Sequence, residues 1–196
     1  MLTKLKQQVQ SFLSSEAALL HRLGLTPNHV SIIGLILALL SAFTYWQWKL
    51  HPFFRILAPM LMLASGLFDA LDGAMARIYG EATKFGGFFD SLLDRYADAV
   101  ILCGITLGGL TELPWGLAAL IGSLLVSYAR ARAEAAGVKM ESIGLAERAE
   151  RIVLLALASV LSYVWIDTLN WSILILAILT NLTVVQRAIY FHKSVQ

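Results

Sequence analysis

Five aspartates lie inside stretches that are otherwise apolar: Asp69, Asp72, Asp90, Asp94 and Asp98. One aspartate at the centre of a membrane helix costs about 2.5–3.5 kcal/mol on insertion scales, so five isolated ones would oppose insertion by roughly ten kcal/mol or more. These carboxylates must therefore face one another, water, a cation or basic side chains. Such a cluster is typical of a catalytic site or of a pathway for ions or protons.

The spacing of the aspartates predicts one shared site. Asp69 and Asp72 are three residues apart and Asp90 and Asp94 are four apart, so each pair lies on one face of a helix. Two facing helices would bring four carboxylates together, and their repulsion in a low dielectric demands a counter-charge. Oxygen-only ligation suits one or two hard divalent cations, Mg²⁺, Mn²⁺ or Ca²⁺, rather than Zn²⁺.

Arg77 favours an enzyme over an ion or proton transporter, which the spacing alone does not distinguish. It lies about 7.5 Å further along the helix axis than Asp72. A cation beside a metal–carboxylate site is what polyphosphate binding requires. Gly73 and Gly86 stand beside the carboxylates and leave room for a substrate or a backbone to approach.

The elements that must position these residues are membrane helices. Of the 196 residues, 58% are hydrophobic and 14% are charged, whereas a soluble domain has roughly 25% charged residues. We predict an all-α membrane protein with six transmembrane helices, in a single domain covering residues 1–196, with the bundle at 30–190. Each predicted span is close to the ~20 residues that cross ~30 Å of hydrocarbon. The spans are 30–49, 54–78, 86–110, 114–135, 149–167 and 170–190.

An amphipathic helix is predicted ahead of the spans, in residues 1–24. Apolar residues recur there at helical spacing: Met1, Leu2, Leu5, Val9, Phe12 and Leu13. Lysines and glutamines fill the other face, which suits a helix on the membrane surface with its basic side chains toward the headgroups. The alternative is a soluble helix packed on the loops. The segment lacks the features of a cleavable signal peptide.

Basic residues predict how the bundle is oriented. Four basic groups fall on one side of a six-helix bundle: Lys4, Lys6 and Arg22; Arg77 and Lys84; Arg130, Arg132, Lys139, Arg148 and Arg151; and Arg187 and Lys193. The opposite side is less positive and carries the tryptophans expected of an interfacial belt. The positive-inside rule then predicts a multi-pass protein of the cell membrane with both termini and the aspartate site facing the cytoplasm.

One continuous pattern contains the acidic site. It reads Asp69-Ala-Leu-Asp72-Gly73-Ala-Met-Ala76-Arg77, eight further residues, and Gly86-Gly-Phe-Phe-Asp90-Ser-Leu-Leu-Asp94. This pattern resembles the complete signature of the CDP-alcohol phosphotransferases (CDP-alcohol phosphatidyltransferases), at the family's spacing. The general resemblance covers nearly the whole chain.

The resemblance implies a division of labour among these residues. The implied metal ligands are Asp69, Asp72, Asp90 and Asp94, holding one or two Mg²⁺ or Mn²⁺ ions. The implied CDP-binding residues are Asp69, Gly73, Ala76, Arg77 and Thr83. Asp94 would also be the base that takes a proton from the acceptor hydroxyl, which attacks the lipid-side phosphorus and releases CMP. Members of the family are typically homodimers, and we expect the same here.

Arginines near the fourth connection favour a phosphorylated acceptor. Arg130, Arg148 and Arg187 would converge on a dianionic group near the metal site. The segments at 128–134 and 144–151 are similar to those of the family's inositol-phosphate branch, the phosphatidylinositol-phosphate and archaetidylinositol-phosphate synthases. That resemblance places the three arginines on acceptor-phosphate positions, with Arg130 where bacterial members usually have lysine. The alternative is that these residues only obey the positive-inside rule.

Supporting roles are predicted for the remaining acidic residues. Asp98 lies one turn beyond Asp94 and outside the signature, so we expect it to hydrogen-bond or to pair with a basic residue rather than to bind metal. Glu134, Glu147 and Glu150 are expected to orient the arginines by ion pairing.

The sequence therefore predicts an enzyme of phospholipid biosynthesis. It would transfer the lipid phosphoryl group from a CDP-linked diacyl or ether lipid to a small phosphorylated alcohol, inositol 1-phosphate, and release CMP. The alternatives are the same chemistry with glycerol 3-phosphate, a cation or proton transporter that uses the aspartates, and a catalytically silent scaffold. The expected partners are the bilayer and a second copy of the chain, and no nucleic acid.

Overall fold

The computed structural model describes the backbone of residues 2–140, 143–145 and 148–195, and the side chains of the same residues except 2–11 and 149. All regular elements in this part of the chain are α-helices, which confirms the all-α fold class. They are α1 (Leu2–Arg22), α2 (Pro27–Trp46), α3 (Phe54–Ile78), α4 (Lys84–Leu107), α5 (Leu113–Ala135), α6 (Arg148–Leu161) and α7 (Asp167–Ser194).

Four of the described helices, α2, α3, α5 and α7, are long and apolar enough to cross a membrane. The α4 helix is long enough, but it carries several charged residues of the acidic site. The α6 helix has 14 residues, which at 1.5 Å per residue is about 21 Å and shorter than a ~30 Å hydrocarbon core. The predicted span at 149–167 thus ends as a helix at Leu161, and the count of six full spans is not confirmed.

Side-chain caps start the two helices that border the acidic site. The Thr26 hydroxyl accepts a hydrogen bond from the backbone N–H of His29, and the His29 ring accepts one from the N–H of Thr26, with Pro27 at the first helical position of α2. Thr83 caps α4, since its hydroxyl accepts a bond from the N–H of Gly86 at 2.9 Å. These caps fix where each helix begins relative to the acidic residues.

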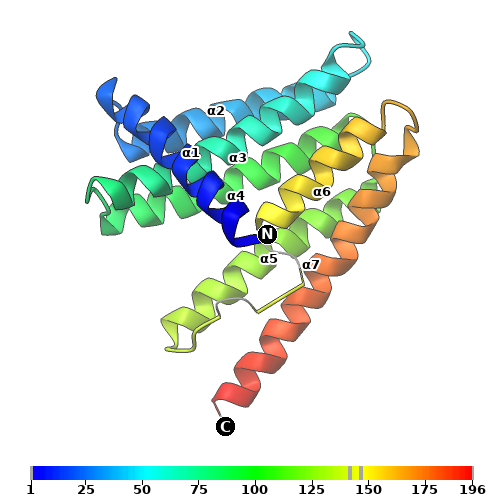
Figure 1. Ribbon diagram of the computed structural model, residues 1–196. Helices are drawn as coiled ribbons and strands as arrows, with labels where there is room; N and C mark the ends of the chain where they lie inside the picture. Colours follow the sequence, from blue (N-terminus) through cyan, green and yellow to red (C-terminus); the bar gives the residue numbers. More distant parts are fainter. Residues whose placement is uncertain (1, 141–142, 146–147, 196) are drawn as a thin grey trace.

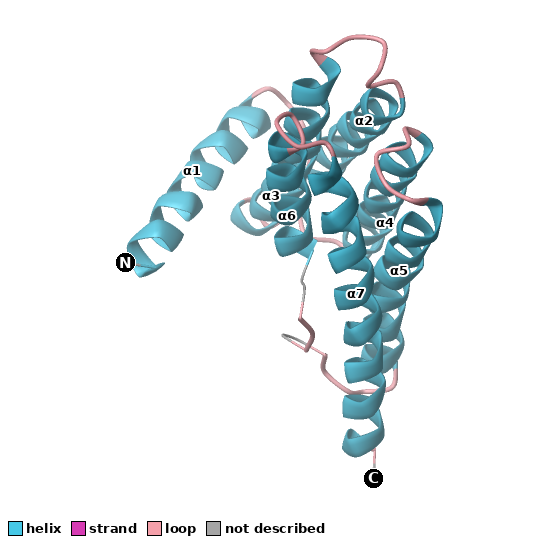
Figure 2. Cartoon of the chain, turned by 90° about the vertical axis from the view of Figure 1, so that its right-hand side faces the viewer, coloured by secondary structure: helices cyan, strands magenta, loops and turns pink. Residues whose placement is uncertain are grey.

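The helices form two groups joined by α4 and α6. The α2, α3 and α4 helices pack together, and α5 and α7 form a second pair (Figure 1). The α4 helix also contacts α5, and α6 lies between α3 and α7. The α1 helix crosses the first group from outside, against α3, and lies at an angle to the bundle (Figure 2).

The described half of α1 packs on protein. Ala17 is fully buried in a cluster with Val30 of α2 and Met75 of α3. The His21 ring stacks on Tyr79 with the ring centroids 3.7 Å apart, and its Nε2 lies 3.2 Å from a carboxylate oxygen of Glu81. The predicted helix at 1–24 is therefore present. The side chains of Lys4 and Lys6 lie outside the described residues, so the membrane-surface position of this helix stays a prediction.

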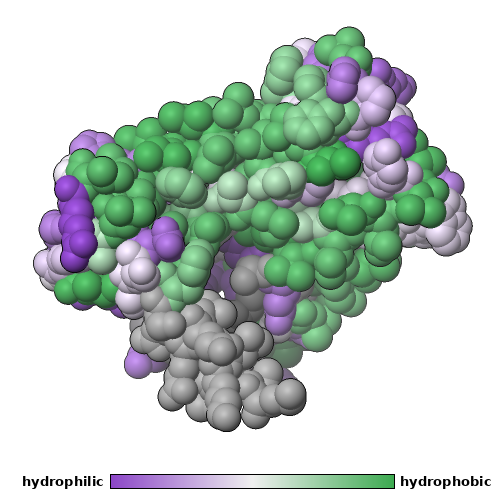
Figure 3. Space-filling model, turned by 45° about the horizontal axis from the view of Figure 1, so that its top comes forward, coloured by the Kyte–Doolittle hydropathy of each residue, from purple (hydrophilic) through white to green (hydrophobic). Residues whose placement is uncertain are grey.

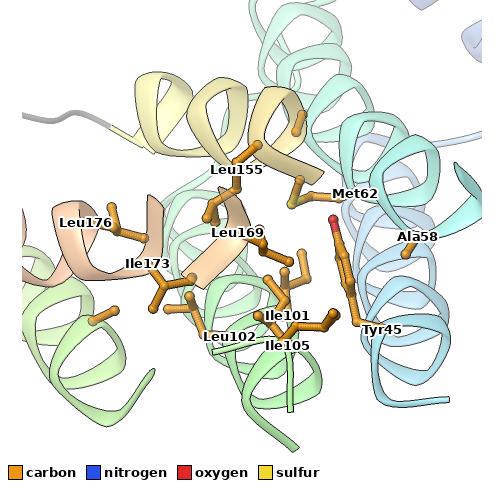
Figure 4. Close-up of a cluster of buried hydrophobic side chains, with 14 of the residues drawn as sticks. Tyr45, Ala58, Met62, Ile101, Leu102, Ile105, Leu155, Leu169, Ile173 and Leu176 are labelled. Carbon is orange, nitrogen blue, oxygen red and sulfur yellow. The ribbon is translucent and has the colours of Figure 1, made fainter. Parts of the chain in front are cut away.

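Large apolar side chains cover the outside of the bundle. Ile36, Leu40 and Phe43 on α2 are all about half exposed, and Figure 3 shows a broad apolar surface with hydrophilic residues gathered toward the ends of the molecule. An exposed apolar area of this extent marks a membrane-facing surface. In the interior, Tyr45 reaches Met62 and Ile101 across the helices (Figure 4), and its hydroxyl lies 2.6 Å from Ser159 Oγ.

Gly104 sets the close contact of α4 with α2. A Cβ built on Gly104 would overlap the backbone of Ala42, whereas a Cβ on Gly87 would meet nothing within 4 Å. We expect Gly104→Ala to destabilise the protein by about 1–3 kcal/mol because backbone atoms must shift, which lowers the melting midpoint by about 2–12 °C. Gly87→Ala is the matched control and should leave the midpoint unchanged in detergent; equal midpoints for the two variants would contradict the close contact.

Candidate active site

Three of the predicted carboxylates meet between α3 and α4. Asp69, Asp72 and Asp90 each offer one oxygen, and the three oxygens lie within 4.8 Å of one another. The arrangement uses oxygen atoms alone, as hard divalent cations require, so these residues fit the predicted metal. Among the described residues this group of three does not include Asp94, which approaches the site through a different contact.

Asp72 is the most enclosed of these carboxylates, with 4% of its surface exposed. Its Oδ2 accepts a hydrogen bond from the Ser31 hydroxyl at 2.5 Å. The bond fixes the orientation of the carboxylate across the α2–α3 interface. Sequence reasoning missed Ser31, although Asn28 and Ser31, three residues apart at the start of an apolar helix, were the available signal.

A cavity of about 200 Å³ opens on one side of the acidic group. Its walls include most of the predicted CDP-binding residues: Gly73, Ala76, Arg77 and Thr83, together with Asp72 and Asp90. A Cβ on Gly73 would lie 3.3 Å from Arg77 Nη1, so the glycine leaves the guanidinium its place. Asp69 lines the adjoining cleft instead. Asn28 and Glu81 also line the cavity and were not predicted.

A second cavity, of about 750 Å³, lies between α4 and α5. Asp94, Arg95, Tyr128 and Arg130 are among its lining residues. The Nε of Arg130 lies 2.9 Å from a carboxylate oxygen of Glu134, which confirms the predicted pairing of these two residues. Arg130, oriented by Glu134, therefore supplies a positive charge to this cavity and does not line the 200 Å³ cavity.

A narrow cleft shares lining residues with both cavities. It shares Asp72 and Asp90 with the 200 Å³ cavity and Asp94 with the 750 Å³ cavity, and Arg148 lines it as well. Asp94 is thus the one signature aspartate that reaches the larger cavity. The sequence predicted that the aspartates meet, and the packing of α3 on α4 separates them into a group of three and a fourth carboxylate beside them.

Arg148 reaches into the acidic site from α6. Its Nη1 lies 2.6 Å from Asp69 Oδ2 and 2.6 Å from Asp94 Oδ1, and its Nε lies 3.1 Å from Asp98 Oδ1. Asp98 also pairs with Arg151, whose Nη2 is 3.1 Å away. The predicted pairing of Asp98 with a basic residue is therefore confirmed. Sequence reasoning gave Arg148 to the acceptor phosphate and did not anticipate its contacts with the aspartates.

The third predicted acceptor arginine, Arg187, is placed differently. It is buried, with 7% of its surface exposed. Its Nη1 donates to the carbonyl of Val126 at 2.5 Å and its Nε to the carbonyl of Ile143 at 2.9 Å. Arg187 lines neither the two cavities nor the cleft between them, in the part of the chain that the structure describes. Glu147 lies outside the described residues, and the role of Glu150 stays a prediction.

Comparison with known proteins identifies the family to which this site belongs. Residues 24–185 match the model of the CDP-alcohol phosphatidyltransferase family. The chain belongs to this family. It is 40% identical to the archaetidylinositol phosphate synthase of Pyrococcus horikoshii, over all of this chain and 99% of that one. It is 34% identical to the phosphatidylinositol phosphate synthase of Mycobacteroides abscessus, over 87% of this chain and 79% of that one.

Solved structures of this family have the same fold. The phosphatidylinositol phosphate synthase of Mycobacterium tuberculosis in complex with manganese and citrate superposes with a TM-score of 0.80 at 30% identity, covering 91% of this chain and 88% of that chain. The same protein with CDP-DAG bound also gives a TM-score of 0.80. The predicted family is confirmed, and the chain is a membrane enzyme of CDP-alcohol phosphatidyl transfer rather than a transporter or a scaffold.

Proposed function

We propose that this enzyme transfers the lipid phosphoryl group of a CDP-linked lipid to inositol 1-phosphate and releases CMP. The observation that carries the proposal is the set of lining residues: a cavity of about 200 Å³ beside Gly73 and Arg77, three clustered carboxylates, Asp94, and a larger cavity lined by Arg130. Relatives that match this chain over its whole length, at 40% and 39% identity, are archaetidylinositol phosphate synthases.

The donor would bind in the 200 Å³ cavity. Arg77 supplies a positive charge for phosphate there, and Gly73 leaves space beside it. A divalent cation held by Asp69, Asp72 and Asp90, Mg²⁺ or Mn²⁺ and one or two ions, would neutralise charge on the pyrophosphate and orient it. The manganese complex of a relative with the same fold supports a divalent metal. Thr83, which caps α4 and lines this cavity, would place the start of that helix against the nucleotide.

Asp94 is the group placed to act as the base. It lines both the cleft beside the donor and the cavity that would hold the acceptor. The acceptor hydroxyl gives its proton to a carboxylate oxygen of Asp94 as its own oxygen forms the bond to the lipid-side phosphorus. The bond from that phosphorus to the CMP oxygen breaks, so the electron pair leaves with CMP and the charges balance.

The acceptor would occupy the 750 Å³ cavity. Arg130 lines it, and Arg148, which lines the neighbouring cleft, contacts the lining residue Asp94. Two guanidinium groups near one hydroxyl-activating carboxylate match an acceptor that carries both a hydroxyl and a phosphate. Arg187 would act indirectly: it would hold the 143–145 segment in place through its hydrogen bond to the carbonyl of Ile143.

The finer architecture is proposed on the same basis. The connections after α2 and α4 lie at one end of the bundle, since Trp48 Nε1 donates to the carbonyl of Gly108 at 2.8 Å, and Thr111 bonds Asn170 at the start of α7 at 2.9 Å. We therefore place α4 and α6 in the membrane as well, in addition to α2, α3, α5 and α7, which gives six membrane-embedded helices in one domain, 1–196. The basic end, with both termini and the acidic site, would face the cytoplasm of the cell membrane, and two copies would form a homodimer.

A panel of acceptors tests the proposal. Purified protein receives a CDP-linked lipid and Mg²⁺ with inositol 1-phosphate, glycerol 3-phosphate or free inositol, and CMP release is measured. We expect kcat/KM for inositol 1-phosphate to exceed the other two by about 10²-fold, because unpaired polar groups in the cavity penalise an analogue that lacks the matching groups. Arg130→Gln should raise KM for inositol 1-phosphate. Turnover with glycerol 3-phosphate but not with inositol 1-phosphate would overturn the assignment.

A further inference from the structure

The Arg148 guanidinium touches carboxylates that have different tasks. Its Nη1 is 2.6 Å from Asp69 Oδ2, an oxygen of the metal-binding group, and 2.6 Å from Asp94 Oδ1, an oxygen of the proposed base. One nitrogen atom therefore joins the metal site to the base. Its side chain is 20% exposed, so water screens these contacts only in part.

A divalent cation and this guanidinium are rivals for Asp69. Both are positive, both take their stabilisation from the same carboxylate, and they repel each other at short range in a low-dielectric site. A cation bound by Asp69, Asp72 and Asp90 weakens the hold of Asp69 on Arg148. A guanidinium released from Asp69 keeps Asp94 and Asp98 as partners but has lost one of its three anions, so the phosphate of an acceptor can take the vacated position.

The surroundings of Arg148 offer its guanidinium a second position, near the proposed acceptor site. The cleft that it lines and the 750 Å³ cavity, where the acceptor phosphate is proposed to bind, share Asp94 as a lining residue. Arg148 Nη1 lies 2.6 Å from the Asp94 carboxylate. Its Nε remains anchored at 3.1 Å from Asp98 Oδ1. Arg151, which is buried and pairs with the other oxygen of Asp98, has an Nε and an Nη1 without hydrogen-bond partners in the described part of the chain. Asp98 thus keeps a cationic partner when Arg148 turns.

We infer that Arg148 couples the metal site to the acceptor site: binding of a divalent cation at Asp69 releases the guanidinium toward the acceptor phosphate. The coupling rests on the proposed function, because it needs an acceptor that carries a phosphate. It is reciprocal, so acceptor phosphate must tighten metal binding by the same factor by which metal tightens acceptor binding.

The coupling also protects the donor. As long as Arg148 pairs with Asp94, the carboxylate that would activate a hydroxyl is engaged by a charge-assisted hydrogen bond. The metal frees the guanidinium from Asp69 alone, and the guanidinium leaves Asp94 only when the acceptor phosphate arrives. Before the acceptor is present, Asp94 therefore does not activate a water molecule, and the CDP-lipid is not hydrolysed.

The experiment measures Mn²⁺ affinity of the full-length protein by electron paramagnetic resonance, with and without inositol 1-phosphate and in the absence of a CDP-lipid, so that no turnover occurs. For the wild type we expect the acceptor to tighten Mn²⁺ binding at least about fivefold. For Arg148→Gln we expect a ratio close to one, together with tighter Mn²⁺ binding in the absence of the acceptor, because the rival charge is gone.

Two further variants control for charge and for folding. Arg132→Gln removes an exposed cation in the last turn of α5 that lines neither cavity nor the cleft, so its ratio should equal that of the wild type. If Arg148→Gln does not fold, Arg148→Lys takes its place, because lysine keeps the positive charge. Its single ammonium group should also lower the ratio. A wild-type ratio retained in Arg148→Gln and Arg148→Lys would overturn the inference, as would a ratio of one in a wild type that binds the acceptor.

The same data separate this inference from the proposed function. If inositol 1-phosphate does not bind the wild type, the proposed acceptor is wrong. Competition between Arg148 and the metal for Asp69 is then judged from Mn²⁺ binding alone. Tighter Mn²⁺ binding by Arg148→Gln but not by Arg132→Gln supports the competition, and equal Mn²⁺ binding by wild type and Arg148→Gln refutes it.

Discussion

Asp94→Asn is expected to lower the rate of CMP release by about 10²–10⁴-fold, the usual contribution of a positioned general base. The amide keeps the shape of the side chain but cannot accept the hydroxyl proton. Asp94 does not line the 200 Å³ cavity, so binding of the CDP-lipid should stay within about threefold of wild type, which places the loss in kcat rather than in donor affinity. Rate assays with labelled donor and separate donor-binding measurements give both quantities.

The matched control for this variant is Asp98→Asn. Asp98 lies one turn further along α4 and shares Arg148 as a partner, but it lines neither cavity nor the cleft. It is a positioning residue, and we expect a loss of about tenfold, the low end of the 10–100-fold range typical of residues that orient a site. A rate for Asp94→Asn within threefold of wild type would remove Asp94 as the base. Equal losses in the two variants would do the same.

Asp72→Asn is expected to abolish divalent metal binding and to reduce kcat/KM by about 10³-fold or more, which corresponds to about 4 kcal/mol. Asp72 belongs to the metal-binding group and also lines the nucleotide-side cavity, so its charge serves both. Loss of one carboxylate leaves the proposed cation with too little counter-charge. Mn²⁺ titration followed by steady-state kinetics over a range of Mg²⁺ concentrations tests this expectation.

Ser31→Ala provides the graded comparison. It keeps the Asp72 carboxylate but removes the 2.5 Å hydrogen bond that orients it. A residue that orients a metal ligand typically changes metal affinity or activity by about 10–100-fold, so Ser31→Ala should fall between the wild type and Asp72→Asn. Wild-type Mn²⁺ affinity in Asp72→Asn would show that the metal, if it binds, does not use this carboxylate.

The class of fold and the acidic site could be read from the sequence because both depend on local periodicity. The composition excludes a water-facing core, and the apolar segments of α2, α3, α5 and α7 were placed within a few residues of their observed limits. Helical spacing fixes which residues share a face, so Asp69 and Asp72 were certain to point the same way once α3 formed. The eight-position signature then identified the family, which the comparison with known proteins confirmed.

The length of α6 was harder to predict. The apolar run continues past Leu161, and hydropathy alone carried the expected span to 167. In the folded chain Ser162 bonds the carbonyl of Ser159 at 2.7 Å, and the chain turns there into α7. A local hydrogen bond of this kind competes with the helix, and whether it prevails depends on what packs around it.

By itself, the sequence determined the membrane-helical class, the family, and the identity of the signature aspartates, because these follow from composition and from spacing along single helices. Only the tertiary structure decided that Ser31 holds Asp72, that Arg148 bridges Asp69 and Asp94, and that Arg187 bonds backbone carbonyls. Each of these contacts joins helices that are far apart in the chain. Their geometry is set by how whole helices pack, and no period within one segment contains that information.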